Sequence, residues 1–202
     1  MQAASFVRPE PPRSSSVDGE VRLVIAGVSW GRYVAIRELL EDHPGLRMSF
    51  LEGVLEIMSP SRRHEREKKL IARLIEAWAL TRRARLDGYG SMTFRKEAAE
   101  RGAEPDGCYV VRGDLGEAPD IAIEVVVTSG GIDKLAVYQG LGVPEVWFFR
   151  DGAFELHRLG DDGYARIERS TFLPELDLVQ LATFVDRDDQ TAAVLAYVDS
   201  LR

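Results

Sequence analysis

Three residues of this chain have the types and the spacing that metal-assisted hydrolysis requires. Asp106 stands at the start of an apolar segment, and Glu124 follows eighteen residues later, inside the aliphatic run at 121–127. Lys134 comes ten residues after Glu124. Two carboxylates at neighbouring strand ends can hold a hard cation such as Mg²⁺, which prefers oxygen ligands. A nearby ammonium can orient the attacking water or offset the charge of a phosphate, so this set predicts hydrolysis of a phosphodiester.

Glu124 is the most informative of the three because its neighbours are almost all aliphatic and β-branched. Residues 121–127 predict a strand that is buried on both faces. An unpaired carboxylate in such a layer is very costly, so Glu124 must be paired, protonated or bound to a cation. Metal binding is one solution. The alternative is a structural ion pair with Lys134 that takes no part in catalysis.

The elements around these residues predict a central mixed β-sheet flanked by helices, in an α/β or α+β fold. The strand at 121–127 leads through a helix from about residue 132 to a strand at 145–150. Such a short crossover makes the two strands parallel. The Asp-Gly pair at 151–152 then predicts a hairpin turn into a strand at 153–159.

The rest of the chain predicts an added N-terminal helix and hairpin, a long helix, two further strands and a last helix. Residues 1–20 are rich in Pro and Ser and predict a disordered tail, which leaves 21–202 as one domain. The predicted elements are a helix from Ser29 to the Pro-Gly pair at 44–45, strands on either side of a turn at 52–53, a helix from Ser61 that closes at the Asp-Gly pair at 87–88, strands around 89–95 and 106–112, and a helix at 189–201.

Composition indicates a globular protein of ordinary make-up. The chain has 202 residues, of which 45% are hydrophobic and 29% charged. No apolar run approaches the length of a membrane span, so no membrane association is expected. The single cysteine, Cys108, allows no internal disulfide, and a reducing cytoplasm is the expected location.

Charge is distributed unevenly along the chain. The net charge of −7 argues against a protein that simply coats nucleic acid. Residues 62–85, however, contain nine basic and three acidic side chains and so carry +6, while the rest of the chain carries −13. This helix could contact the phosphate backbone of a nucleic acid, or it could be an ordinary solvated face.

Three segments together resemble a known family. They are LEGVLEIMSPSRRHE at 51–65, EPDGCYV at 104–110 and PDIAIEVVVTSGGIDKLAVYQGLGVPEVWFF at 119–149. They resemble the Uma-type family of bacterial restriction endonucleases, which is placed in the PD-(D/E)XK nuclease superfamily. The likeness runs from about residue 46 to about residue 181. It implies a restriction-endonuclease-like core, a four-stranded mixed sheet flanked by helices, and Mg²⁺-dependent cleavage of DNA.

The resemblance also implies roles for individual residues. Asp106 matches the motif aspartate and Glu124 the motif acid, and Glu65 is the nearest match to an acidic metal ligand on the first helix of the superfamily. One departure stands out, because the superfamily signature places a lysine two residues after the acid, where this chain has Val126. The resemblance then makes Lys134 the substitute, reaching the site from the helix.

Two further residues are weaker candidates. His64 matches a histidine of the family pattern, although a lone histidine is more often a surface or capping residue. Asp120 lies four residues before Glu124 and shares its face by strand alternation, but it suits the first position of the strand better than a ligand role. Asp106 itself has the simpler alternative of capping a turn after Pro105.

The function expected from these observations is a Mg²⁺-dependent DNA endonuclease in which Mn²⁺ can replace Mg²⁺. DNA is the expected partner, and a homodimer is expected because two strands of a duplex call for two sites. The alternative is a catalytically inactive nuclease-fold module for binding or interaction, with Glu124 and Lys134 as its structural ion pair. An RNA or nucleotide phosphodiesterase would share the chemistry and differ only in substrate.

Overall fold

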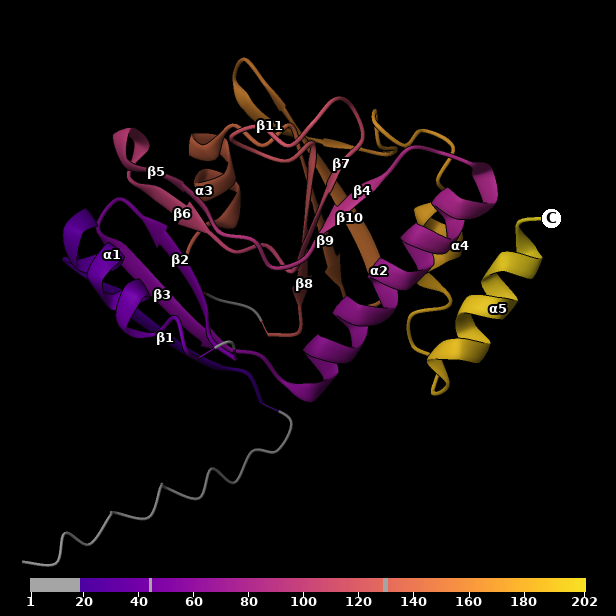
Figure 1. Cartoon of the computed structure of the whole chain (residues 1–202), viewed down its shortest axis with the longest axis horizontal. Helices are drawn as coiled ribbons and strands as arrows, with labels where there is room; N and C mark the ends of the chain where they lie inside the picture. Colours follow the sequence, from indigo (N-terminus) through magenta and orange to yellow (C-terminus); the bar gives the residue numbers. More distant parts are fainter. Residues whose placement is uncertain (1–18, 44, 129–130) are drawn as a thin grey trace, which may run out of the picture.

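The strands of this protein form two β-sheets, shown by a computed structural model that describes residues 19–43, 45–128 and 131–202 (Figure 1). The first 18 residues of the predicted tail lie outside this description. The first sheet is antiparallel and has the spatial order β1 (Val21–Ala26), β3 (Val54–Ser59), β2 (Arg47–Leu51), β6 (Arg101–Ala103) and β5 (Phe94–Lys96). The second sheet has the order β11 (Gly163–Ile167), β10 (Ala153–Gly160), β9 (Glu145–Arg150), β8 (Ile121–Val126), β7 (Gly107–Val110) and β4 (Asp87–Tyr89).

Helices cover both faces of the second sheet. The helices are α1 (Trp30–Leu39), α2 (Arg62–Arg82), α3 (Lys134–Leu141), α4 (Leu178–Ala182) and α5 (Gln190–Ser200), with a 3₁₀ turn at Glu97–Ala99. The apolar residues of α2, α4 and α5 pack against one face of this sheet, and those of α3 pack against the other. Figure 1 shows α5 beside α2, while α1 lies over the first sheet, where it forms a small core of its own.

Strand β8 lies in the middle of this arrangement, and its side chains alternate between the two cores. Ile121, Ile123 and Val125 belong to the core under α2, whereas Ala122 belongs to the core under α3. Alternation along the strand therefore places Glu124 on the α3 face. The pairing of β8 with β9 is parallel, which confirms the predicted crossover through α3.

The mixed sheet and both predicted hairpins are confirmed. The turn between β2 and β3 has positive φ at Glu52 and Gly53, and the turn between β9 and β10 has positive φ at Asp151 and Gly152. A positive φ at both central residues matches the twist of the paired strands, and glycine adopts it without strain. The first hairpin is part of a separate sheet, because β1 and β6 pair along its two sides.

The predicted end of the long helix is wrong. Helix α2 ends at Arg82, and Arg83 closes it in the left-handed conformation. The Asp-Gly pair at 87–88 instead opens β4, which pairs with β7. The last apolar residue that α2 buries is Ala79, so nothing beyond it holds another turn against the core.

Four short elements are absent from the sequence-based prediction. These are β1, β11 and α4, each at most six residues long, and the three-residue strand β6. β1 has the sequence VRLVIA, which is apolar at five of six positions and so shows no polar–apolar alternation, yet most of its side chains are exposed. None of the helices in the described ranges combines the length and apolar character that a membrane crossing requires.

Candidate active site

Asp106, just before β7, lies close to Glu124 of β8, since its Oδ2 accepts a hydrogen bond from the N–H of Val125, the residue after Glu124. The antiparallel register of β7 and β8 pairs Gly107 with Ile123, and Asp106 comes one residue before this last pair. The backbone N–H of Asp106 donates a hydrogen bond to the carbonyl of Ile123 at 3.0 Å, one residue out of this register, so Asp106 and Gly107 both lie opposite Ile123 as in a β-bulge. Both side chains are buried, with 4% of Asp106 and 6% of Glu124 exposed. One carboxylate thus lies just before β7 and the other inside β8.

Helix α3 supplies the groups that contact Glu124. The ammonium of Lys134, the first residue of α3, lies 3.2 Å from Oε1 of Glu124. The hydroxyl of Tyr138, one turn further along the helix, donates a hydrogen bond to the same oxygen. Lys134 also donates to Oγ of Ser49 on β2 at 2.7 Å, so it links the two sheets.

Burial and charge set the protonation of this group. Burial raises the pKa of Glu124, Lys134 opposes the rise, and the charge of Asp106 adds to it. Burial alone would lower the pKa of Lys134, but the charges of Glu124, Glu56 and Asp106 outweigh it and raise that pKa. Burial also raises the pKa of Tyr138 well above its ordinary value, so its hydroxyl remains a donor. Glu124 is therefore a carboxyl group that is costly to ionise without a cation beside it.

Asp106 is held from the other side, by α2 and the backbone of β8. Its Oδ1 lies 2.8 Å from Nε2 of His64, and its Oδ2 accepts a hydrogen bond from the N–H of Val125 at 2.8 Å. Burial would raise the pKa of Asp106, but the hydrogen bond and charge of His64 lower it further than burial raises it. Asp106 is thus the ionised member of the carboxylate pair.

A third carboxylate reaches this group through His64. Nδ1 of His64 lies 2.5 Å from Oε1 of Glu20, whose Oε2 accepts a hydrogen bond from the hydroxyl of Thr128 at 2.5 Å. Burial would lower the pKa of His64, but its hydrogen bonds and charge interactions with Asp106 and Glu20 raise it overall. Glu20 is the last residue of the predicted tail, yet its side chain is fully buried in this site.

The local sequence explains why His64 points at Asp106. Pro60 follows β3, and Ser61 caps α2 by accepting a hydrogen bond from the N–H of His64 at 3.1 Å. The first turn of α2 is thereby fixed beside the start of β7. Adjacent residues on a helix point in directions about 100° apart, so His64 and Glu65 do not face the same group.

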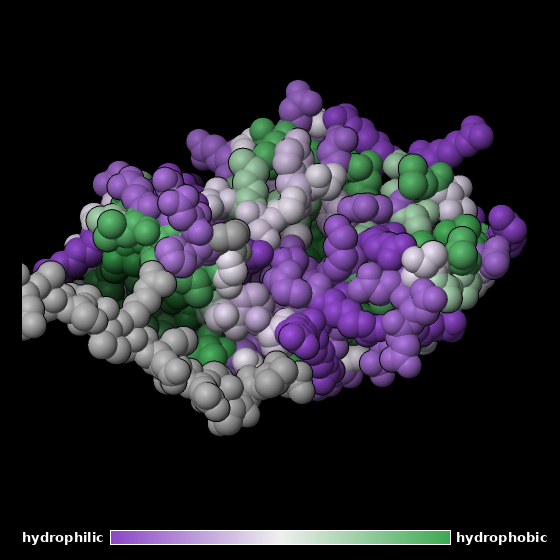
Figure 2. All heavy atoms as spheres, turned by 60° about the horizontal axis from the view of Figure 1, so that its bottom comes forward, coloured by the Kyte–Doolittle hydropathy of each residue, from purple (hydrophilic) through white to green (hydrophobic). Residues whose placement is uncertain are grey.

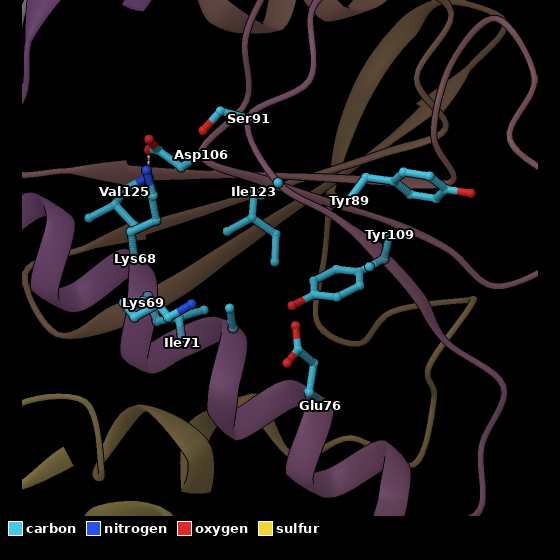
Figure 3. Close-up of a pocket in the computed structure, with 14 residues that line it drawn as sticks. Lys68, Lys69, Ile71, Glu76, Tyr89, Ser91, Asp106, Tyr109, Ile123 and Val125 are labelled. Atoms are coloured by element: carbon cyan, nitrogen blue, oxygen red, sulfur yellow. Dashed lines mark hydrogen bonds between the residues drawn. The ribbon is translucent and has the colours of Figure 1, made fainter. Parts of the chain in front are cut away.

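The buried pair opens onto two cavities. Asp106 lines a cavity of about 360 Å³ between α2 and strands β4 and β7 (Figure 3). Glu124 and Lys134 line another of about 440 Å³ that includes Arg22. Val125 borders both cavities. The two carboxylates are buried among side chains, but small molecules can approach each of them.

Comparison with models of known protein families assigns this chain to one of them. Residues 33–192 match the model of the Uma2 family, which is described as "putative restriction endonuclease". The chain belongs to the Uma2 family. The matched residues include His64, Asp106, Glu124, Lys134 and Tyr138, and they leave out Glu20.

The comparisons with solved structures and with curated proteins add little to the family assignment. The chain resembles a crystal structure described as "a putative nuclease belonging to DUF820" from Anabaena variabilis, with 12% sequence identity and a TM-score of 0.47. That similarity covers 75% of this chain and 90% of the other. No curated protein matches the chain.

Two predicted residues of this Uma2 protein lie in other surroundings. Glu65 is 44% exposed and pairs with Lys68 at 2.9 Å, so the structure does not bring it to the two carboxylates. Oδ2 of Asp120 accepts hydrogen bonds from the N–H groups of Val111 and Arg112, at 2.7 and 2.9 Å. Asp120 thus ties the start of β8 to the end of β7.

The carboxylate oxygens of this site are the kind of ligand that a small hard cation prefers. Within the described ranges, no group of three or more His, Cys, Asp and Glu side chains is arranged to hold a metal ion. Mg²⁺ needs no such group, because it keeps several waters and binds through one or two carboxylates together with substrate phosphates. Oε1 of Glu124 already accepts from both Lys134 and Tyr138, so the positions open to a cation are Oε2 of Glu124 and the second lone pair of each Asp106 oxygen. Asp106 and Glu124 could therefore hold Mg²⁺ between them.

Two residues of the site have no place in the sequence-based prediction. Tyr138 follows Lys134 by four residues, and helical spacing alone would place both on one face of α3. Glu20 has no such signal, because it reaches His64 only after β1 pairs with β3.

Proposed function

We propose that this chain is a Mg²⁺-dependent endonuclease that hydrolyses phosphodiester bonds of DNA. Membership of the Uma2 family supports a nuclease-like function. The observation that supports the finer proposal is the closeness of two buried carboxylates, Asp106 and Glu124, with an ammonium 3.2 Å from Glu124. This is the set that the sequence predicts for metal-assisted hydrolysis.

Each residue has a defined part in the proposed reaction. Asp106 and Glu124 would hold the cation, and Mn²⁺ could replace Mg²⁺ there. When bound, the cation lowers the pKa of water and offsets the charge of the scissile phosphate. Lys134 orients the attacking water or balances the developing negative charge. His64 positions Asp106, and Tyr138 positions Glu124.

The charge of α2 supports a nucleic-acid substrate. Figure 2 shows hydrophilic side chains gathered on the surface where α2 begins, and residues 62–82, which form α2, carry +4 from seven basic and three acidic side chains. Some of these charges are already paired, as Arg63 with Glu67 and Lys68 with Glu65. Binding through the remaining cations would weaken strongly as salt rises.

A non-catalytic module is the second candidate, and a specific observation favours it. The Glu124–Lys134 pair is complete as an ion pair, and both oxygens of Asp106 already accept hydrogen bonds or contact His64. A protein with this network could keep the nuclease fold and bind a partner without cleaving it. The two candidates differ in whether a divalent cation has any effect.

Cleavage of single-stranded circular DNA and of supercoiled plasmid tests the proposal. We expect Mg²⁺-stimulated nicking by the wild-type protein and a loss on the order of 100-fold in Asp106→Asn. The matched control is Asp120→Asn, which alters a carboxylate near the same strands and should keep most of the activity. Circular dichroism checks that both variants are folded. Absence of cleavage by the wild-type protein with Mg²⁺ or Mn²⁺ would favour the non-catalytic module, and full activity of Asp106→Asn would refute the assigned site.

A further inference from the structure

The cavity beside Asp106 extends away from the carboxylate pair along α2. Its volume is about 360 Å³, near the lower end of the range of roughly 300–1,000 Å³ for small-molecule sites. Figure 3 shows Asp106 at one end and the side chains of Glu76 and Tyr109 at the other. A compact group connected to a phosphate at Asp106 would therefore reach toward Glu76 and Tyr109.

The middle of the cavity is apolar. Ile71 and Ala72 line it from α2, and Ile123 and Val125 line it from β8. Aliphatic walls of this kind can contact the faces of a flat ring. Gly88 lines the far end, where a Cβ would come within 3.0 Å of the Tyr109 ring and 3.4 Å of a Glu76 oxygen. The glycine keeps this end open, since a side chain there would occupy the space.

The far end carries a pair of hydrogen-bonding groups. In Figure 3 the hydroxyl of Tyr109 and the carboxylate of Glu76 point toward each other. Burial, with a smaller contribution from the charge of Glu76, raises the pKa of Tyr109, so the phenol stays protonated. The end of the cavity thus offers an acceptor in Glu76 and a hydroxyl that can donate or accept.

The rim near Asp106 is basic. Lys68 and Lys69 line the cavity from the first half of α2, and Lys68 pairs with Glu65 at 2.9 Å. Ammonium groups at a cavity mouth favour a ligand that carries phosphate. The cavity thus offers cations for a phosphate at its mouth, aliphatic walls for a flat ring and hydrogen-bonding groups at its far end. These features match the parts of one nucleotide.

We infer that this cavity binds one unpaired nucleobase of the substrate and prefers a base with an exocyclic amino group. A carboxylate accepts a hydrogen bond from the amino group of cytosine, whereas thymine presents a carbonyl oxygen at the same position. A base inside a duplex cannot enter, because it must first be unstacked and unpaired. The inference rests on the proposed function and adds to it a substrate class, single-stranded or locally opened DNA.

Fluorescence anisotropy with labelled oligonucleotides tests the inference. The full chain is titrated, in EDTA so that nothing is cleaved, against oligodeoxycytidine, oligodeoxythymidine and a mixed-sequence duplex of equal length. We expect oligodeoxycytidine to bind about tenfold more tightly than oligodeoxythymidine, and the duplex to bind no better than the latter. Glu76→Gln should reduce the preference for cytidine to within about twofold, because an amide presents a donor as well as an acceptor.

A pair of alanine substitutions on α2 provides the steric test. Ala72→Leu would fill the cavity and should weaken binding of oligodeoxycytidine by about tenfold. The matched control is Ala77→Leu, at another half-buried alanine of the same helix that does not line the cavity. Its binding should equal that of the wild-type protein. Equal binding of all three nucleic acids by the wild-type protein, or equal effects of the two leucines, would overturn the inference.

Failure of the inference and failure of the proposed function give different results. Mg²⁺-dependent cleavage without any preference for cytidine or for single strands would refute the base-binding cavity and support the proposed nuclease activity. The opposite result is base-dependent binding that Ala72→Leu weakens, with no cleavage by the wild-type protein in Mg²⁺ or Mn²⁺. It would support the base-binding cavity and refute the proposed nuclease activity.

Discussion

Glu124 and Glu145 are both carboxylates buried in the second sheet, on the neighbouring strands β8 and β9, but their surroundings differ. Glu145 is fully buried, and each of its oxygens accepts two hydrogen bonds. One oxygen accepts from the N–H and hydroxyl of Thr171, and the other accepts from the indole of Trp147 and the hydroxyl of Ser170. These bonds fasten the segment after β11 to the sheet.

Glu124 is held in another way. Its hydrogen bonds from Lys134 and Tyr138 both go to Oε1, the charge of a second carboxylate, Asp106, acts on it, and it lines a cavity of about 440 Å³. Burial therefore does not distinguish a structural carboxylate from a reactive one. Both carboxylates have a cation nearby, since the guanidinium of Arg158 lies 3.6 Å from Oε1 of Glu145. The difference is that neutral donors bond both oxygens of Glu145, whereas the donors to Glu124 both bond Oε1 and Glu124 lines a cavity.

The largest expected difference between the two carboxylates is in DNA cleavage. Glu124→Gln should lower Mg²⁺-stimulated cleavage on the order of 1,000-fold, because it removes an anionic ligand next to the reacting phosphate. Glu145→Gln should leave the activity per folded molecule unchanged. The measurement is the initial rate of plasmid nicking, with the folded fraction of each variant determined by circular dichroism. Equal losses in both variants would remove the distinction drawn between them.

The order reverses for stability. Glu145→Gln should lower the free energy of unfolding by about 3 kcal/mol, because the amide NH₂ cannot accept the hydrogen bonds that one carboxylate oxygen receives. For a chain of this size that corresponds to a fall in melting temperature of roughly 6–12 °C. Glu124→Gln should cost about half as much or less, because its amide oxygen can still accept from Tyr138 and Lys134. Thermal denaturation in EDTA measures both, and a larger loss in Glu124→Gln would identify Glu124 as the structural carboxylate.

Divalent cations should separate the two carboxylates without any substrate. A ligand that binds only the folded state stabilises it by about 2.7 kcal/mol at a concentration 100 times its Kd, which corresponds to roughly 5–10 °C here. We expect Mn²⁺ to raise the melting temperature of the wild-type protein and of Glu145→Gln, and to leave that of Glu124→Gln nearly unchanged. A rise of the same size in all three proteins would place the cation elsewhere.

The smallest expected effect is the pH dependence that His64 contributes in EDTA. The pKa of His64 is raised above its ordinary value of 6.5, so the folded state binds this proton more tightly than the unfolded state. The resulting stabilisation is fully present below pH 6.5 and is lost as pH rises through the raised pKa. His64→Gln should lack this decline when melting temperatures are compared from pH 6 to pH 9. A decline of the same size in the variant would assign it to another group.

Local sequence predicts Glu124 and Lys134 as neighbours, whereas the choice of a site role over a turn cap for Asp106 depends also on the family resemblance. An acid inside an aliphatic strand, an aspartate that opens the neighbouring strand and a lysine on the crossover helix have local signals, because strand and helix periodicity place them. The structure brings Asp106, Glu124 and Lys134 together on that basis. Tyr138 could have been added from its spacing of four residues after Lys134.

Tertiary contacts decide the remaining parts of the site. Glu20 belongs to it because β1 runs along the edge of the first sheet, a pairing that β1's exposed side chains do not predict. His64 and Glu65 are adjacent on α2 and point in directions about 100° apart. His64 therefore contacts Asp106, whereas Glu65 pairs with Lys68. The cavity with Glu76 at its far end also depends on β4, which lies where the sequence predicts the end of the long helix.

Anomalous scattering from crystals soaked with Mn²⁺ tests most directly whether Asp106 and Glu124 form a cation site. We predict a peak between the two side chains, with at least one oxygen of each at about 2.0–2.2 Å from the ion, the range expected for small divalent cations bound to oxygen. An ion at this position would either displace His64 from Oδ1 of Asp106 or share that oxygen with it. A crystal with bound Mn²⁺ elsewhere, or with the Glu124–Lys134 pair intact and no peak beside it, would contradict the account.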